Sequence, residues 1–277
     1  MFRKIRKLVG YYLQKEQVRF VNFKTAGIHL KALKGTERKN ADLDDAWFFE
    51  LTKYHDVIFD IGCNIGYMSL LAAIQPNNKK IVLVDPNPEA LSKASQNLII
   101  NGYGLKCNFV SAFIGEKDGE AIKFYTIGSG EAGSMFAGHA ETASIIDSFY
   151  FVNQLTIDYL VEQLNCCPGL IKIDVEGAES FALNGAVKTA ENSKTKFMIE
   201  MHSPPELNMQ ENAERILSWC NKNRYTPFYM KEAIELTVSH QIAHRGKCHL
   251  LLVPQGEPYP NYLKNIPQGS PLPILLP

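Results

Sequence analysis

The motif D-x-G-x-N-x-G that begins at residue 60 has the residue types and spacing best suited to bind a ligand. An apolar run over 57–60 leads into it, and an apolar-periodic segment follows over 66–74, which predicts a strand, a tight turn and a helix. Glycines in such a turn let a ligand approach the backbone, because no Cβ atom stands in the way. The residues of the motif that we expect to bind the ligand are Asp60, Gly62, Asn64 and Gly66.

The spacing of the glycines excludes two common nucleotide motifs. A dinucleotide fingerprint G-x-G-x-x-G that started at Gly62 would need glycines where Asn64 and Tyr67 stand. A phosphate-binding G-x-x-x-x-G-K-[ST] loop fails because no lysine follows Gly66. The motif therefore favours a ligand with positive charge near the turn and no pyrophosphate. S-adenosylmethionine (SAM), which carries an ammonium and a sulfonium group, fits that description.

A second acid, Asp85, follows the next predicted strand, 81–84. It lies about 20 residues beyond the glycines, where a βαβ unit places the acid that binds ribose hydroxyls. Asn87 then begins the following predicted helix and is expected to contact the same ligand. Asp60 and Asp85 could instead cap the helices that follow them, but their joint spacing favours a nucleoside ligand.

Composition limits the class of protein. The chain has 277 residues, enough for one large α/β domain, and its 29 basic and 29 acidic residues give no net charge. No global basic field therefore predicts binding to nucleic acid. The six cysteines form no C-x-x-C pair, so we expect reduced thiols in a cytosolic protein. The basic segment 1–9 could lie on an anionic membrane surface, but we favour a solvated first helix turn.

Three parts are expected along the chain. Residues 1–50 form an N-terminal preamble of a helix and an extended segment, residues 51–254 the main domain, and residues 255–277 a Pro-rich tail. Small residues and glycines over about 127–148 predict a lid-like loop within the main domain, with a surface insertion of no such role as the alternative. His139 in this loop could touch a substrate, although we expect it to be solvated.

Predicted strands and helices alternate through the main domain, which indicates a doubly wound, mostly parallel α/β sheet. The predicted strands are 57–60, 81–84, 107–112, 120–126, 170–174, 197–202, 226–230 and 249–253. The predicted helices are 2–15, 42–51, 66–74, 88–100, 179–190 and 212–223, and an extended stretch covers 18–23. Ligands bind beyond the carboxyl ends of strands in such sheets. The residues at those ends are Asp60, Asp85, Ser111, Ala112, Asp174, Glu200 and His202.

Methyl transfer from SAM needs donor and acceptor in line, and a hydroxyl acceptor should also lose a proton. His202 is a candidate general base because histidine titrates near physiological pH; the alternative is a histidine satisfied by neighbouring backbone. Glu200 and Asp174 complete the candidate catalytic set, whereas Lys172 is expected to pair with an acid and receives no catalytic role. Asp174, Glu200 and His202 could also hold a divalent ion, but we predict no metal site.

Four segments that carry these candidates resemble the FkbM-type methyltransferases. They are V-I-F-D-I-G-C-N-I-G over 57–66, T-I-D-Y-L over 156–160, L-I-K-I-D-V-E-G-A-E over 170–179 and I-E-M-H over 199–202. The K-I-D-V-E-G-A-E string is the most specific of them. The likeness covers about 57–202 and leaves both ends of the chain outside it.

The resemblance implies a class I, Rossmann-like methyltransferase fold: a seven-stranded, mostly parallel sheet with a reversed last strand. It also implies O-methylation, often of sugar or natural-product hydroxyls. It places the motif residues Asp60, Gly62, Asn64 and Gly66 on the methionine portion of SAM, Asp85 on the ribose, and Ser111 and Ala112 near the adenine. We therefore expect a cytosolic SAM-dependent O-methyltransferase whose acceptor is a hydroxyl of a saccharide or glycosylated metabolite.

Two other functions stay open at this point. A protein that binds SAM without catalysis could serve as a partner subunit, although the polar residues after the fourth and fifth core strands argue against it. An NAD-dependent oxidoreductase is disfavoured by the missing third glycine. The oligomeric state is not predicted.

Overall fold

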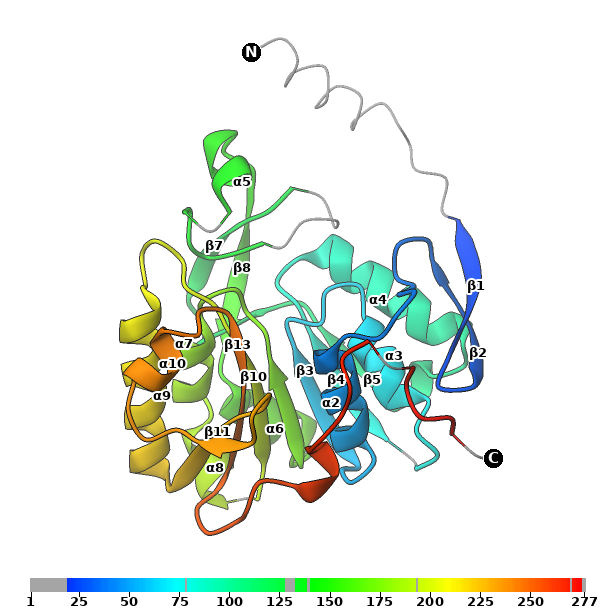
Figure 1. The fold of residues 1–277 in the computed structure, drawn as a ribbon. Helices are drawn as coiled ribbons and strands as arrows, with labels where there is room; N and C mark the ends of the chain where they lie inside the picture. Colours follow the sequence, from blue (N-terminus) through cyan, green and yellow to red (C-terminus); the bar gives the residue numbers. More distant parts are fainter. Residues whose placement is uncertain are drawn as a thin grey trace.

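The computed structural model describes residues 19–77, 79–127, 133–138, 140–192, 194–269 and 271–275. A central sheet lies between helices on both of its faces, and a smaller sheet with a short helix projects beyond it (Figure 1). In the order in which they pair, the central strands are β12 (Ile234–Glu235), β11 (Tyr225–Tyr229), β13 (Cys248–Pro254), β10 (Lys196–Met201), β9 (Leu170–Ile173), β3 (Val57–Ile61), β4 (Lys80–Val84) and β5 (Cys107–Val110).

The strand directions confirm the predicted fold class. Strands β5, β4, β3, β9 and β10 are parallel, and β13 runs antiparallel to both of its neighbours, β10 and β11. Because β13 is the last strand in the chain, the sheet is mostly parallel with a reversed last strand, as a Rossmann-like class I methyltransferase fold requires. The other seven strands of the central sheet were predicted, and the two-residue β12 is an additional strand at one edge.

Helices cover both faces of the sheet because the side chains of a strand alternate between them. Ile58 packs in one hydrophobic cluster with α2 (Leu43–Thr52), α3 (Tyr67–Ala73) and α4 (Pro88–Ile100). The adjacent Phe59 packs in the other, with helices α6 (Ile157–Leu164), α7 (Glu179–Asn184), α8 (Val187–Asn192), α9 (Met209–Asn223) and α10 (His240–Ala243). Burial on both sides explains why the central strands are continuous apolar runs.

The N-terminal preamble contributes to the core of the main domain. Its described part is a hairpin of β1 (Phe20–Thr25) and β2 (Ile28–Leu33), followed by α2. The predicted helix over 42–51 is confirmed: Asp42 caps α2 in a reciprocal capping box with Asp45. Sequence patterns did not predict β2. One hydrophobic cluster contains side chains of both α2 and α3. It therefore spans residue 50, where we predicted the boundary between preamble and main domain, and that boundary stays a prediction.

The smaller sheet contains β6 (Phe113–Ile114), β8 (Phe149–Leu155) and β7 (Ala121–Tyr125), and α5 (Glu141–Ile145) lies between β7 and β8 in the chain. The strand predicted over 120–126 is confirmed, but β8 was missed. The strand predicted over 107–112 ends early, at Val110, because the chain then leaves the central sheet to pair Phe113 with Gln154. His139 and residues 128–132 of the lid-like loop lie outside the described residues, and its lid role stays a prediction.

Two other predicted segments differ from the structure. The helix predicted over 179–190 is two helices, α7 and α8. The N–H groups of Lys188 and Thr189, which would continue the first helix, donate instead to the carboxylate of Asp158. The Pro-rich tail packs part of its length on the core: Tyr259, Leu263 and Leu272 join the cluster that contains α2. The helix predicted over 2–15 lies outside the described residues. Among the helices that the structure describes, none is long and apolar enough to cross a bilayer.

Removing the Phe48 side chain tests whether α2 belongs to the cooperative core. Phe48 is fully buried, so Phe48→Ala should lower the free energy of unfolding by about 3–5 kcal/mol through lost contacts and a residual cavity. Urea unfolding measures the change. Leu105→Ala, at an exposed side chain, is the control and should change stability by less than about 0.5 kcal/mol. A Phe48→Ala effect as small as the control would place α2 outside the core.

Candidate active site

The turn between β3 and α3 is shaped by close packing. Gly62 and Gly66 both have positive φ angles, 79° and 81°. A Cβ atom at Gly62 would lie 1.8 Å from the carbonyl oxygen of Asp174, and one at Gly66 would lie 2.9 Å from the Cβ of Ala94. Only glycine therefore fits at these positions, and the turn lies directly against the end of β9.

Asp85 ties this turn to the end of β4. Its two carboxylate oxygens accept the backbone N–H groups of Asn64, at 2.7 Å, and Asn87, at 2.8 Å. Asn87 in turn caps α4, since its Oδ1 accepts the N–H groups of Glu89 and Ala90. Burial raises the pKa of Asp85 to about 6, although both backbone hydrogen bonds act in the opposite direction. The carboxylate is thus already oriented at the strand end.

A cleft at the strand ends brings together most of the predicted donor-binding residues. This strand-end cleft is lined by Ile61, Gly62, Asn64, Val84, Asp85, Pro86, Asn87, Ala90, Ala112, Phe113, Ile114, Phe124, Gly133, Asp174, Val175 and Glu176. Phe113 and Phe124 come from the smaller sheet, and sequence reasoning missed them because only tertiary packing brings that sheet to the cleft. Three predicted residues, Asp60, Gly66 and Ser111, are not among the lining residues.

Asp60 lies behind the turn instead. It is fully buried, and its Oδ2 accepts the hydroxyl of Ser69 at 2.6 Å. Its Oδ1 lies 3.8 Å from the ammonium of Lys172. The side chain of Asp60 therefore does not line the strand-end cleft, contrary to the expectation that it faces the ligand.

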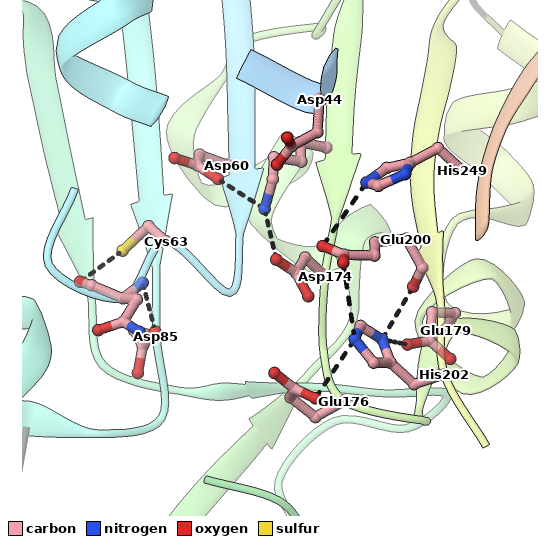
Figure 2. A network of polar contacts seen from close by, with 12 residues as sticks. Asp44, Asp60, Cys63, Asp85, Asp174, Glu176, Glu179, Glu200, His202 and His249 are labelled. Carbon is pink, nitrogen blue, oxygen red and sulfur yellow. Dashed lines mark hydrogen bonds and ion pairs between the residues drawn. The ribbon is translucent and has the colours of Figure 1, made fainter. Parts of the chain in front are cut away.

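Lys172 is a buried cation between the carboxylates of Asp60 and Asp174, both of which are labelled in Figure 2. Its ammonium donates to Oδ2 of Asp174 at 3.0 Å. Burial lowers the pKa of Lys172, but Asp174 and Asp60 more than offset this, so the pKa is raised and the side chain stays charged. Burial raises the pKa of Asp174 to about 6 against the pull of Lys172. Asp174 is therefore largely ionised at neutral pH and able to accept a proton.

Glu200 is held as a permanent anion. Its carboxylate lies 2.6 Å from the ammonium of Lys247. It also lies 3.7 Å from Nε2 of His249, whose ring points toward it in Figure 2. Burial acts to raise the pKa of Glu200, but the hydrogen bonds from His249 and Lys247 hold it below its usual range. Glu200 lies near Asp174, as predicted, but its environment makes it a weak proton acceptor.

His202 is surrounded by carboxylates. Its Nδ1 lies 3.0 Å from Oε1 of Glu179, and its Nε2 lies 3.4 Å from Oε2 of Glu176. Burial opposes the charged form, yet these acids raise the pKa of His202 to about 9. A general base must be neutral before the reaction, so this environment favours the alternative that the sequence left open, a histidine satisfied by its neighbours. The role of His202 as the base stays a prediction.

Glu179 explains the second half of the K-I-D-V-E-G-A-E string. Its buried carboxylate accepts the N–H of Gly177 at 2.9 Å and the side-chain amide of Asn212 at 3.0 Å, and it pairs with His202. These contacts fix the loop after β9, in which Glu176 and Gly177 have φ angles of 53° and 103°. Glu179 and His202 thus hold in place the loop that carries Asp174 and Glu176.

A second space, the polar cavity, begins where the strand-end cleft ends. Its charged lining residues are Arg38, Asp42, Asp44, Lys172, Asp174, Glu200, Lys231 and Lys247. Asp174 lines both spaces. Asp174, Glu200 and His202 offer ligand atoms within 4.8 Å of one another, which is close enough to bind one metal ion. However, Asp174 and Glu200 are each already paired with an ammonium group.

With this geometry established, comparison with known proteins identifies the family. A model of the FkbM methyltransferase domain matches residues 60–227. The chain belongs to the FkbM methyltransferase family. The match begins at Asp60 and includes the strand-end turn, β9 with its loop, and β10 with His202. Comparison with curated proteins gives no match.

Solved structures add three similar chains to the FkbM family match. One is a methyltransferase FkbM from Methylobacillus flagellatus KT, with 15% identity and a TM-score of 0.45 over 72% of this chain and 43% of that chain. The protein thus spans less than half of that chain. Another is the O-methyltransferase TomG from Streptomyces achromogenes, involved in tomaymycin synthesis and in complex with SAM, with 11% identity and a TM-score of 0.46 over 77% of this chain and 80% of that chain. The third is an O-methyltransferase from Bacillus cereus in complex with SAH, with 12% identity and a TM-score of 0.43 over 79% and 82%.

In this FkbM-family protein, the positive charge of His202 predicts how the free energy of unfolding depends on pH. Its pKa rises from 6.5 to about 9 on folding, which corresponds to at most about 3 kcal/mol at about 1.36 kcal/mol per pKa unit. A raised pKa stabilises fully below the unfolded value and loses its effect as pH rises through about 9. The extra stability of the wild type over His202→Gln should therefore shrink as pH increases.

Urea unfolding of both proteins from about pH 6 to about pH 10 measures this difference. His29→Gln is the matched control, because His29 is exposed on β2; this surface substitution should change stability by less than about 0.5 kcal/mol. A stability difference for His202→Gln that stays constant over this range would contradict a charged His202.

Proposed function

We propose that this protein is a SAM-dependent O-methyltransferase that acts on a hydroxyl group of a saccharide or glycosylated metabolite. The observation that carries the proposal is the charge of the strand-end cleft. The charged side chains among its lining residues are Asp85, Asp174 and Glu176, all of them acids. A cleft lined by one sign of charge concentrates ligands of the opposite sign, and SAM is cationic at its sulfonium and ammonium groups. A pyrophosphate, as in NAD, would meet these acids without a lining cation.

The lining residues suit the two ends of SAM. Asp85 keeps acceptor capacity for ribose hydroxyls, because each of its oxygens accepts one backbone N–H and a carboxylate offers about four acceptor positions in all. Ala112, Phe113 and Phe124 offer an apolar wall for the adenine. Asn64 and Asp174 are then left for the methionine end, as the sequence predicted for Asn64. In this proposal Asp60, Gly66 and Ser111 act indirectly, by shaping the turn and the strand ends.

Asp174 is our candidate for the general base. When bound, SAM supplies a methyl group activated by its sulfonium. The acceptor hydroxyl gives its proton to the carboxylate of Asp174 as its oxygen forms the bond to the methyl carbon, while the carbon–sulfur bond breaks and its electron pair stays on sulfur. Lys172 remains charged and holds Asp174 ionised until the acceptor binds.

The polar cavity supports a hydroxyl-rich acceptor, because its lining offers ammonium donors and carboxylate acceptors side by side. The family resemblance to enzymes that methylate sugar and natural-product hydroxyls points the same way. We place the reaction in the cytosol, as the use of unpaired cysteines in the sequence predicts.

Donor binding gives the most direct test. Calorimetric titration with SAM and with S-adenosylhomocysteine (SAH) should show saturable binding. Asp85→Asn should weaken SAH by about 10- to 100-fold, because hydrogen bonds to a charged group contribute about 1.5–3 kcal/mol. Asp56→Asn is the matched control, since Asp56 is exposed at the opposite end of β3. Absence of binding heat for both compounds would rule the proposal out, and an unchanged Asp85→Asn would remove the ribose assignment.

The pH dependence of turnover separates the two candidate bases. A base acts in its deprotonated form, so with Asp174 in this role activity should rise through about pH 6 and then level off. With His202 it would rise through about pH 9. Mass spectrometry of methylated products from a panel of glycans measures the rate, and Asp174→Asn should abolish it. SAH binding without product from any glycan would instead favour an inactive partner subunit.

A further inference from the structure

The polar cavity has the size and position of an acceptor site. Its volume is about 580 Å³, within the range of about 300–1,000 Å³ that small-molecule sites span. Because Asp174 lines both this cavity and the strand-end cleft, a molecule in the cavity can present a group to Asp174 while the donor occupies the cleft. The two substrates would then meet at the residue that accepts the proton.

Most of this cavity is built by segments outside the matched FkbM domain, residues 60–227. Only Met68, Lys172, Asp174 and Glu200 among its lining residues lie within that range. The others come from the N-terminal part, such as Asp44 and Trp47 of α2, from the chain at and after the end of β11, from the start of β13, and from the tail at Gln268. The side that adjoins the strand-end cleft thus lies within the matched domain, whereas the remaining walls are contributed by the flanking segments.

The charges in the cavity are balanced. Four basic side chains and four acids line it: Arg38, Lys172, Lys231 and Lys247, and Asp42, Asp44, Asp174 and Glu200. The closest opposite pairs are Lys247 with Glu200, at 2.6 Å, and Lys172 with Asp174, at 3.0 Å.

Arg38, another lining residue, also lies among acids. It lies 3.8 Å from Asp44 and 3.9 Å from Asp42, and it also pairs with the buried Asp45 at 2.6 Å. A charged ligand group of either sign would therefore approach a like charge and disturb a partly buried pair, which is costly. A hydroxyl group both donates and accepts, so it can bridge such pairs without adding charge.

We infer that the polar cavity is the acceptor site, that it takes a neutral molecule with several hydroxyl groups, and that the segments flanking the FkbM domain select that molecule. The inference rests on the proposed function, because it assigns the second substrate of that reaction. Phosphorylated sugars and amino sugars are excluded as preferred acceptors, since their charges would face the balanced pairs.

Saturation-transfer NMR on the full chain, saturated with SAH, tests the class of acceptor. The neutral probes are methyl glycosides of glucose, mannose, galactose and rhamnose, and the charged probes are glucose phosphate and glucosamine. Transfer to at least one neutral glycoside, and weaker or no transfer to both charged sugars, is expected. Preference for a charged sugar, or no transfer to any glycoside, overturns the inference. SAH is titrated separately, so failure of SAH itself to bind identifies failure of the proposed function.

Substitutions in the flanking segments test where selection occurs. Asp44→Ala and Gln268→Ala should each weaken the bound glycoside by about fivefold or more, because each removes a hydrogen-bonding group, while SAH affinity changes less than about twofold. Lys117→Ala, at an exposed residue near the smaller sheet, is the control and should leave both affinities unchanged. Wild-type glycoside affinity in both cavity variants, with normal SAH binding, would overturn the role of the flanking segments.

Discussion

The ammonium of Lys172, buried between Asp60 and Asp174, is the interaction on which the rest of the site depends. Its positive charge compensates two carboxylates at the ends of adjacent parallel strands. These strands, β3 and β9, pair in register up to Ile61 and Ile173. Removing one partner of a buried pair leaves a charge that costs several kcal/mol. The close contact of Gly62 with the backbone of Asp174 holds the two strand ends together. Lys172 thus links the turn after β3 to Asp174, the residue that we propose as the base.

The distribution of charge divides the site into two spaces with different preferences. The strand-end cleft exposes acids, which suits a cationic donor, while the polar cavity is lined by equal numbers of basic and acidic side chains. Lys172 lines the second space but not the first. A single lysine can therefore neutralise Asp174 from the acceptor side without placing a cation against the sulfonium of the donor. This arrangement keeps donor attraction and acceptor recognition separate, although both spaces share Asp174.

The acids around His202 serve a different purpose from those in the cleft. Glu179 is fully buried and accepts from Gly177, Asn212 and His202, so every contact works to fix the loop that follows β9. A charged His202 balances Glu179 and Glu176 at the same time. The string of acids after β9 therefore combines a side chain that can react, Asp174, with side chains that hold it in place. Rigid support of this kind is what in-line methyl transfer requires.

Several parts of this site follow from local sequence pattern. The apolar run before Asp60 and the glycines after it predicted β3, the turn and α3, because a two-sided buried strand and a left-handed turn need those residue types in that order. The same reasoning placed Asp85 and Ala112 at strand ends and Asn87 at the start of the next helix, and all three line the cleft in the structure. Parallel strands bring their ends to one edge, so the existence of a site there could be predicted without knowing any long-range contact.

Other features could not be predicted, since they depend on residues far apart in the chain. The sequence shows Asp60, Lys172 and His202 as polar residues near strand ends, but only packing decides that Asp60 is hidden, that Lys172 joins two acids, and that Glu176 and Glu179 keep His202 charged. Likewise β8, the split between α7 and α8, and the cavity walls from Asp44 and Gln268 come from contacts between distant segments. The order of residues along the chain determined the sheet and the edge at which we expect ligands to bind. The tertiary structure alone decided the charge states and the acceptor-side walls, because both are set by distances between side chains that the sequence does not record.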